Sequence, residues 1–209
     1  MVLSLFDHSN KIRDEFHRKG FQALSLDVAK PNKKNPQDLC MDIMLFNYKA
    51  FHQSHFTFLF IALPCQVYSI ASGSYHFKNS RPQTKVAIKH IEILIRVYQI
   101  TQYFKCDFII ENPAGGLINN KFFKSFFKLD ITRITLKSFG YITQKKTDLF
   151  NNFNLLLLNS PVHRVNGIYQ KSKLDNLGYR ARVTYPANFV ETIVDSIINQ
   201  SKTLVKWQN

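Results

Sequence analysis

Two residues that directly follow apolar segments have side chains suited to nucleophilic catalysis. Cys65 follows the apolar segment 58–63, and Glu111 follows the apolar segment 108–110. A cysteine thiolate can form near neutral pH and add to an electron-poor carbon. A carboxylic acid can then protonate a ring nitrogen on which charge develops. The pair therefore predicts covalent catalysis, with Cys65 as the nucleophile and Glu111 as the acid.

Both residues also have a purely structural explanation. A cysteine on an apolar strand is usually packed in the core, which is what we expect for Cys40 and Cys106. Cys65 differs from these because it lies beyond the apolar run, between a proline and a glutamine. Glu111 could instead cap a turn or pair with a lysine. Asn112, together with the proline after it, is expected to shape the loop that aims Glu111.

The segments that must position these residues alternate between strand and helix. Apolar runs bounded by polar and turn residues predict strands at 2–6, 23–26, 58–63, 108–110, 131–136 and 153–158. Apolar spacing of three and four predicts helices at 11–19, 86–104 and 187–198, the second with Ile88, Ile91 and Ile95 on its buried face. This order predicts one doubly wound α/β domain over residues 1–209, with a mostly parallel sheet covered on both faces.

Polar or reactive residues follow four of the expected strands. These residues are Asp7, Asp27, Cys65 and Glu111. Ligands of open α/β sheets bind at the carboxyl ends of the strands. The four side chains should therefore converge on one edge of the sheet, although they are far apart in the sequence.

The composition favours a nucleic-acid partner, either DNA or RNA. The chain has 28 Lys and Arg residues against 14 Asp and Glu residues, a formal net charge of +14. Such an excess suits binding to phosphates, although a compositional bias of the source, with its many Asn residues, is an alternative. No apolar run is long enough to span a membrane, and the three scattered cysteines form no CxxC pair. We therefore expect a cytoplasmic protein without a membrane segment, a signal peptide or a metal site.

The sequences Pro64-Cys65-Gln66 and Glu111-Asn112 resemble the catalytic motifs of DNA cytosine carbon-5 methyltransferases. The chain is most similar to short, phage-type members of this superfamily, because segments 145–151 and 180–186 resemble two further family segments. The resemblance extends over nearly the whole chain. It implies a Rossmann-like, S-adenosylmethionine-dependent methyltransferase fold without a large target-recognition domain. It also implies a role with phage or mobile elements, such as restriction-modification.

The activity implied by the resemblance is methyl transfer from S-adenosylmethionine to carbon 5 of cytosine through a covalent Cys65 adduct. Pro64 and Asn112 complete the catalytic motifs around Cys65 and Glu111. Since the target carbon lies inside a duplex, the base must be flipped out or already single-stranded.

The resemblance further implies a cofactor site. Asp27 matches the acid that binds ribose hydroxyls, and Asp42 with Ile43 resembles the adenine contact. Phe6 is expected to pack against the cofactor beside Asp7. A surface acid is an alternative reading of Asp42, and a core aromatic is an alternative reading of Phe6.

Nucleic-acid contacts are expected from residues with amide or basic side chains, namely Gln66, Gln144, Lys145, Lys146, Arg180 and Arg182. Residues 144–146 could also support the catalytic loop or form no more than a solvated face.

The chain departs from the family pattern in its first loop, residues 6–11, which contains no glycine. Glycine there usually allows positive φ and a close approach of the backbone to the cofactor. Asn10 and Asp7 tolerate left-handed conformations better than most residues, so the turn can form, with weaker cofactor binding as the cost.

Two alternatives follow from these departures. The chain could be a catalytically inactive methyltransferase-like protein that binds nucleic acid, or it could methylate cytosine in RNA. Because the chain is too short for a large recognition domain, sequence specificity should be relaxed or supplied by a partner protein.

Overall fold

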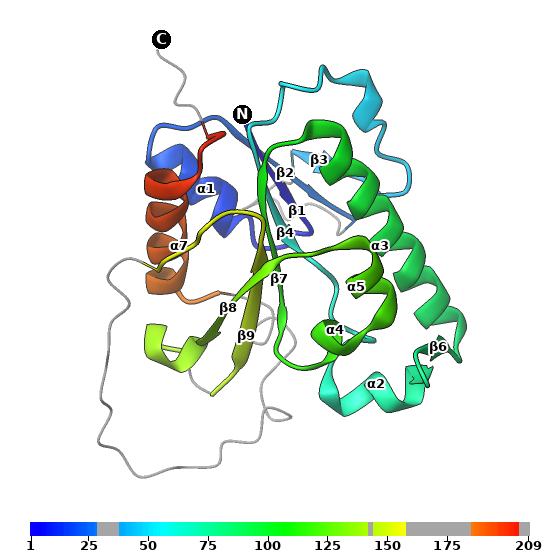
Figure 1. Ribbon diagram of the computed structural model, residues 1–209. Coiled ribbons are helices and arrows are strands. Elements are labelled where there is room, and N and C mark those ends of the chain that lie inside the picture. The colour runs from blue at the N-terminus through cyan, green and yellow to red at the C-terminus, as the bar shows by residue number, and fades with distance from the viewer. Residues whose placement is uncertain (29–37, 142–143, 158–184, 205–209) are drawn as a thin grey trace.

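A seven-stranded sheet lies at the centre of the molecule in the computed structural model, which describes residues 1–28, 38–141, 144–157 and 185–204 (Figure 1). The strand order is β3-β2-β1-β4-β7-β9-β8. The strands are β1 (Val2–Leu5), β2 (Ala23–Asp27), β3 (Leu39–Cys40), β4 (Phe58–Ala62), β7 (Asp107–Pro113), β8 (Asp130–Thr135) and β9 (Lys146–Asn151). The first five of these run parallel, whereas β9 is antiparallel to both of its neighbours.

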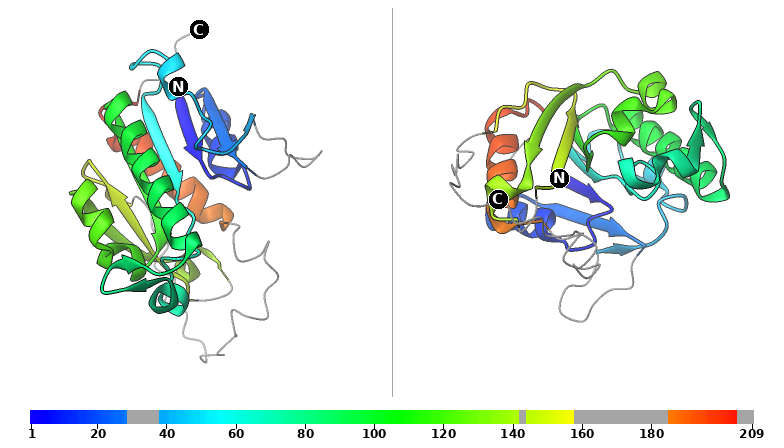
Figure 2. Two further views of the ribbon diagram at one scale, coloured as in Figure 1. Left: turned by 90° about the vertical axis from the view of Figure 1, so that its right-hand side faces the viewer. Right: turned by 90° about the horizontal axis from the view of Figure 1, so that it is seen from below.

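Helices cover both faces of this sheet (Figures 1 and 2). One face carries α1 (Lys11–Arg18) and α7 (Ala187–Gln200). The other face carries α3 (Lys85–Phe104), α4 (Gly116–Asn119) and α5 (Lys121–Phe126). The predicted doubly wound α/β fold is therefore confirmed.

Shorter elements complete the described part of the chain. The helix α2 (Ile70–His76) and the small hairpin of β5 (Phe77–Lys78) and β6 (Arg81–Pro82) connect β4 to α3. Two 3-10 turns, η1 (Tyr48–Ala50) and η2 (Leu136–Phe139), lie in the connections before β4 and after β8.

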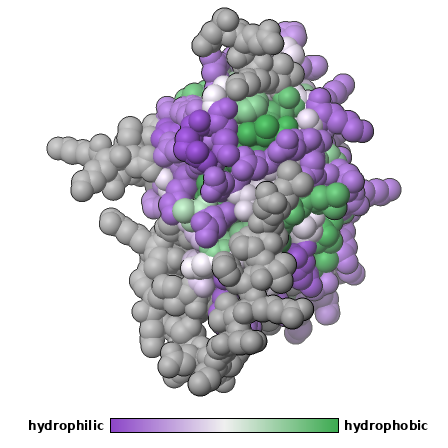
Figure 3. Space-filling model, turned by 90° about the vertical axis from the view of Figure 1, so that its left-hand side faces the viewer, coloured by the Kyte–Doolittle hydropathy of each residue, from purple (hydrophilic) through white to green (hydrophobic). Residues whose placement is uncertain are grey.

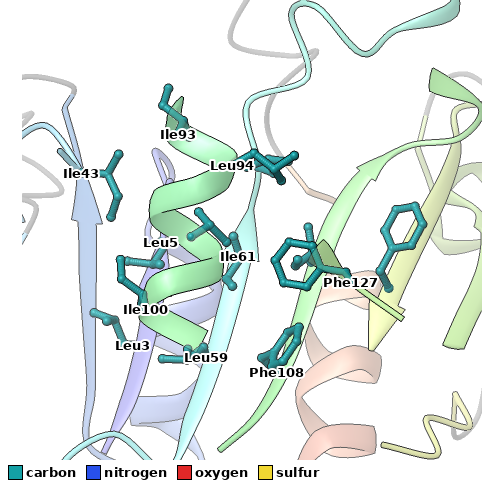
Figure 4. Close-up of a cluster of buried hydrophobic side chains, with 14 of the residues drawn as sticks. Leu3, Leu5, Ile43, Leu59, Ile61, Ile93, Leu94, Ile100, Phe108 and Phe127 are labelled. Carbon is teal, nitrogen blue, oxygen red and sulfur yellow. The ribbon is translucent and has the colours of Figure 1, made fainter. Parts of the chain in front are cut away.

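The apolar runs of the central strands become strands because both of their faces are buried. Side chains alternate across a strand, so Leu3, Leu5, Leu59 and Ile61 pack toward α3, as Figure 4 shows. Val2, Phe58 and Phe60 point to the opposite face and pack with Phe16 of α1 and Ile193 of α7, residues of a second buried cluster. The two cores hold the carboxyl ends of the strands in a fixed arrangement.

The buried face of α3 differs from the predicted one. Ile91 is buried as expected, but Ile88 is 48% exposed and Ile95 is 37% exposed. The buried residues of this helix are Ala87, His90, Ile91, Ile93, Leu94, Val97, Ile100, Thr101 and Phe104. The prediction failed because apolar residues occur all around this helix, so that spacing alone did not select one face.

The strand predicted at 153–158 is also wrong within the described residues, since 153–157 are irregular. The prediction missed the two-residue strands β3, β5 and β6 and the longer β9, whose polar residues Asp148 and Asn151 conceal it in the sequence. Asp148 is buried and accepts two hydrogen bonds from Arg133 of β8, at 2.6 and 2.9 Å. A buried acid thus fits in the sheet because a neighbouring strand supplies its counter-charge.

The surface outside α1 and α7 is mostly hydrophilic, with smaller hydrophobic areas between (Figure 3). None of the helices in the described ranges is long and apolar enough to cross a membrane. Within those same ranges, no three His, Cys, Asp or Glu side chains are grouped so as to hold a metal ion.

Candidate active site

Four parallel strands end at one edge of the sheet, at the bottom of Figure 1. Leu5 of β1 is in register with Leu26 and Ile61, and Ala62 of β4 is in register with Glu111. The segments that carry Asp7, Asp27, Cys65 and Glu111 therefore leave the sheet at the same edge. The antiparallel β9 starts at this edge, which places Lys145 and Lys146 beside the end of β7.

Cys65 lies in a turn whose backbone is held at three consecutive carbonyl groups. The side-chain amide of Asn112 donates to the carbonyl of Leu63 at 2.9 Å. The ring of His90 hydrogen-bonds the carbonyl of Pro64, and the carbonyl of Cys65 accepts from two backbone amides at 3.0 and 3.1 Å. The thiol is half-buried at the end of this turn, so its position is fixed while it stays reachable.

Glu111 is a buried carboxyl group near the end of β7. It is 5% exposed, and burial raises its pKa above the ordinary value, whereas the nearby charge of Lys145 and the hydroxyl of Tyr185 act in the opposite direction. Tyr185 donates a hydrogen bond of 2.8 Å to Oε2 of Glu111. Within the described part of the chain, Oε1 has no hydrogen-bond partner. The neutral acid is thereby favoured, with one oxygen available to a ligand.

Lys145 is close enough to influence the pKa values of both Cys65 and Glu111. Burial raises the pKa of the Cys65 thiol, the charge of Glu111 raises it further, and the charge of Lys145 lowers it. The thiolate is therefore favoured when Glu111 is neutral and Lys145 is charged. That is the protonation state required of a nucleophile beside a general acid.

The first loop takes up the left-handed backbone conformations that glycine usually provides. Phe6 has φ 61° and Asn10 has φ 57°. Asn10 has the left-handed conformation that was expected of it. The other left-handed residue in the loop is Phe6 and not Asp7. An aromatic residue at positive φ is strained, and such strain is commonly found at binding sites.

Asp7 turns its carboxylate into this loop. It is 2% exposed and accepts hydrogen bonds from the Ser4 hydroxyl at 3.1 Å and from the Arg13 amide at 3.3 Å. Burial raises its pKa. These contacts order the loop between β1 and α1.

The other residues of the predicted cofactor site lie around the ends of β2 and β3. Asp27 is buried as the last residue of β2. Asp42 accepts a hydrogen bond from the Met44 amide at 3.0 Å and pairs with Lys89 at 3.6 Å, contacts that also fit the alternative of a surface acid. Ile43 is buried, and Phe6 packs at the edge of the core.

Among the residues predicted to contact nucleic acid, Gln66, Gln144 and Lys146 are exposed, and Lys145 lies near Cys65 and Glu111. Arg180 and Arg182 lie outside the described residues.

Three residues near the site carried no role in the sequence prediction. Tyr185 contacts Glu111, His90 holds the turn before Cys65, and Gly116 touches the same turn from the other side. Spacing could have singled out His90, a polar residue on the apolar side of a helix. The contacts of Tyr185 and Gly116 depend on tertiary packing and leave no local signal.

Comparison with known proteins gives matches in structure. No protein-family model matches the sequence, and no curated protein matches it at a significant level. The structure is similar to that of a prophage-encoded protein assigned as a DNA modification methyltransferase (E. coli), with a TM-score of 0.51, 15% identity and coverage of 72% of this chain and 45% of that one. The chain has a methyltransferase fold.

Two further solved structures share this fold. Entamoeba histolytica methyltransferase EhMeth matches with a TM-score of 0.52 and 14% identity over 72% of this chain and 52% of that chain. The S. pombe Dnmt2 methyltransferase matches with a TM-score of 0.50 and 13% identity over 81% of this chain and 56% of that chain. The chain thus spans about half the length of the structures it matches. The methyltransferase fold agrees with the resemblance noted in the catalytic motifs.

Proposed function

We propose that this chain is the catalytic domain of an S-adenosylmethionine-dependent methyltransferase that modifies carbon 5 of cytosine in DNA. The observation that carries the proposal is the grouping of Cys65, Glu111 and Lys145 at the carboxyl edge of a methyltransferase-fold sheet. A thiol, a buried acid and a cation with mutually adjusted pKa values indicate a catalytic site more strongly than any of them alone.

The chemistry assigns a distinct task to each of the three side chains. The Cys65 thiolate adds to carbon 6 of the ring, and the displaced electron pair is taken up as Glu111 protonates ring nitrogen 3. Lys145 stabilises the thiolate before the addition. S-adenosylmethionine, when bound, supplies an electrophilic methyl group. The proton on carbon 5 is then released to water, the thiolate departs, and nitrogen 3 returns its proton to Glu111.

The residues around the first two strands fit such a cofactor. Asp27 offers a buried carboxylate at the end of β2, where nucleotide-binding α/β proteins hold ribose hydroxyls. Phe6 and Asn10 adopt the backbone conformations that a close approach to the cofactor requires, despite the lack of glycine. Asp42 and Ile43 follow β3 and are proposed to flank the adenine.

The distribution of charge supports a nucleic-acid substrate. Residues 43–91 contain no Asp or Glu, whereas Lys49, Lys78, Arg81, Lys85 and Lys89 fall within them. Residues 64–85 of this stretch carry Cys65, α2 and the β5–β6 hairpin at the end of the molecule where β4 finishes (Figure 1), whereas Lys49 lies in η1, before β4 begins. Lys89 pairs with Asp42 at 3.6 Å, so Lys78, Arg81 and Lys85 are the cations of this stretch that we propose to bind phosphates near Cys65.

The β5–β6 hairpin presents two of these cations on a tight turn. Asn79 and Ser80 both have positive φ, 51° and 64°, which brings Lys78 and Arg81 directly opposite each other. Both side chains are exposed. We propose that they contact the phosphate backbone close to the target base.

Replacing both hairpin cations by glutamine (Lys78→Gln with Arg81→Gln) should weaken nucleic-acid binding for all sequences alike. A plot of log K against log salt should become shallower by about 2, because each lost phosphate contact removes nearly one released counterion. Titrations monitored by fluorescence anisotropy at several salt concentrations measure both quantities. The matched control is Lys105→Gln with Lys202→Gln, two exposed cations beyond the ends of α3 and α7. If both double variants lost the same binding affinity, the hairpin would not belong to the proposed interface.

The proposed activity is tested by nucleoside mass spectrometry in cells that lack their own cytosine methylase. Expression of the chain should produce 5-methylcytosine in DNA, and expression of Cys65→Ala should not. Methylcytosine that appears in RNA alone would move the substrate to RNA. If neither nucleic acid is modified and no S-adenosylmethionine binds at millimolar concentration, the chain is instead the inactive nucleic-acid-binding protein considered above.

A further inference from the structure

Tyr185 is a buried phenol held firmly beside the proposed acid. Its side chain is 7% exposed and packs edge-on against Phe60 and at a tilt against Phe189, with ring centroids 6.3 and 5.3 Å apart. Its carbonyl group accepts a hydrogen bond of 2.7 Å from the ammonium group of Lys11. The ring therefore cannot swing away from the sheet without breaking its contacts to β4 and α7, and Lys11 of α1 holds the backbone of the same residue.

The hydroxyl of Tyr185 donates to one oxygen of Glu111 only. The bond runs to Oε2 at 2.8 Å, and Oε1 has no partner among the described residues. Burial and the charge of Glu111 raise the pKa of Tyr185 well above its ordinary value, so the phenol remains a donor throughout the working pH range. An oxygen that accepts this bond is the poorer place for the proton of a neutral carboxyl group.

We propose that Tyr185 is a positioning residue for Glu111: it holds Oε2 and leaves Oε1 to carry the proton and deliver it to the target base. This inference rests on the proposed function, since it assigns the proton-donating oxygen of that site. The proton moves from Oε1 to the ring nitrogen as Cys65 adds, and it returns to Oε1 when Cys65 leaves. Tyr185 donates the same hydrogen bond at each stage and loses no proton itself.

The charged and titratable groups that influence the protonation of Glu111 and its hydrogen bond from Tyr185 come from four segments of the chain. Cys65 lies after β4, Lys145 lies before β9, and Tyr185 lies before α7, all near Glu111. Asp7, in the loop after β1, faces Tyr185. A variant of Tyr185 should therefore act on Cys65 mainly through Glu111, which is the coupling that the experiment measures.

The test follows the alkylation of Cys65 by iodoacetamide as a function of pH, with peptide mass spectrometry to separate Cys65 from the other two cysteines. Tyr185→Phe removes the donor to the carboxylate, so Glu111 stays neutral to higher pH and its charge no longer opposes the thiolate. The midpoint for alkylation should fall by about one pH unit. Glu111→Gln should lower it similarly, and the double variant should show no further shift.

Additive shifts in the double variant, or an unchanged midpoint in folded Tyr185→Phe, would overturn the proposal. If Tyr185→Phe does not fold, 2,3-difluorotyrosine at position 185 keeps the ring and strengthens the donor. In the protein with this residue, the pH midpoint for alkylation of Cys65 should lie at or above that of the unmodified protein. A lower midpoint counts against the proposal.

A second arm measures turnover in the protein that methylates DNA. Tyr185→Phe should lower kcat about 10- to 100-fold with little change in the KM for DNA, and the alkaline limb of the rate profile should move to higher pH. A purely structural role would alter thermal stability and KM but would not move that limb. Because the alkylation assay needs no methyl transfer, an inactive wild type would contradict the proposed function without deciding the role of Tyr185.

Discussion

Replacement of Glu111 by glutamine should lower kcat for methyl transfer about 10²- to 10⁴-fold, the usual contribution of a general acid. Glutamine has nearly the same shape and can still accept a hydrogen bond from Tyr185 through its side-chain oxygen. It cannot give a proton to the ring as Cys65 adds. The measurement is single-turnover methyl transfer with saturating DNA and cofactor, and a variant that keeps more than a tenth of the wild-type rate would exclude Glu111 as the acid.

The same substitution should stabilise the folded protein. Burial raises the pKa of Glu111 above its ordinary value of 4.5, so the folded state holds the proton more tightly than the unfolded state does. The stability associated with this proton is fully present below pH 4.5 and is lost as the pH rises through the raised pKa. Each unit by which the pKa is raised corresponds to about 1.4 kcal/mol. Glu111→Gln should therefore melt at a higher temperature than the wild type at pH 7, and this advantage should vanish near pH 4.

A neighbouring acid provides the contrasting control. Asp148 is buried to a similar degree, but its two hydrogen bonds to Arg133 compensate its charge. Asp148→Asn is therefore expected to lower thermal stability at pH 7, opposite to Glu111→Gln. An uncompensated acid that costs stability while it supports activity is the pattern of a functional residue, whereas a paired acid contributes to the fold.

The sequence was sufficient to predict the fold because its strongest signals are local. The run 58–63 is apolar along its whole length and 2–6 is interrupted by Ser4 alone, as expected of strands buried on both faces. The helix 11–19 has a single apolar stripe with Ile12 and Phe16, and it was placed correctly. Strand β9 was missed because Asp148 and Asn151 are compensated or buried by tertiary contacts that no local pattern records.

The candidate site, too, was predictable from the sequence only in part. Cys65 and Glu111 could be found because each follows an apolar run and is a residue type that has specific chemistry. The direction in which each side chain is held could not be found, because His90, Tyr185 and Gly116 act from other elements. Phe6 is a further case: a positive φ at an aromatic residue runs against local preference and is imposed by the surrounding loop.

Gly116 is the position where a single methyl group should do most damage to the site. A Cβ atom built on Gly116 would lie 1.3 Å from the carbonyl oxygen of Tyr68 and 2.3 Å from its carbonyl carbon. Both are backbone atoms, so no side chain can rotate to make room. Either α4 or the turn that contains Cys65 has to move.

The turn cannot move without breaking other contacts. The ring of Tyr68 is 2% exposed and stacks on Phe77 with centroids 5.9 Å apart, and its hydroxyl donates to the carbonyl of His90 at 3.2 Å. The amide of Tyr68 in turn bonds the carbonyl of Cys65. A displacement of Tyr68 is therefore passed directly to Cys65, three residues away.

Gly116→Ala should destabilise the protein by about 3 kcal/mol and lower the rate of methyl transfer at least about 100-fold, since overpacking strains the core and a shift of about 1 Å misplaces a catalytic group. Chemical denaturation gives the first quantity, and single-turnover kinetics under conditions where the variant is folded give the second. The matched control is Gly73→Ala in α2, on the other side of the same turn. There the nearest atom to a new Cβ is the carbonyl oxygen of Val67 at 3.7 Å, an ordinary contact, and alanine should stabilise the helix by about 0.5–1 kcal/mol.

These two glycine variants separate local packing from a general sensitivity of the region. Opposite signs for the two stability changes, with activity lost only in Gly116→Ala, would establish the contact between α4 and the Cys65 turn as the feature that holds the nucleophile in place. Equal and small effects would mean that the turn yields freely. In that case the three carbonyl contacts from Asn112, His90 and the turn itself would have to position Cys65 without support from α4.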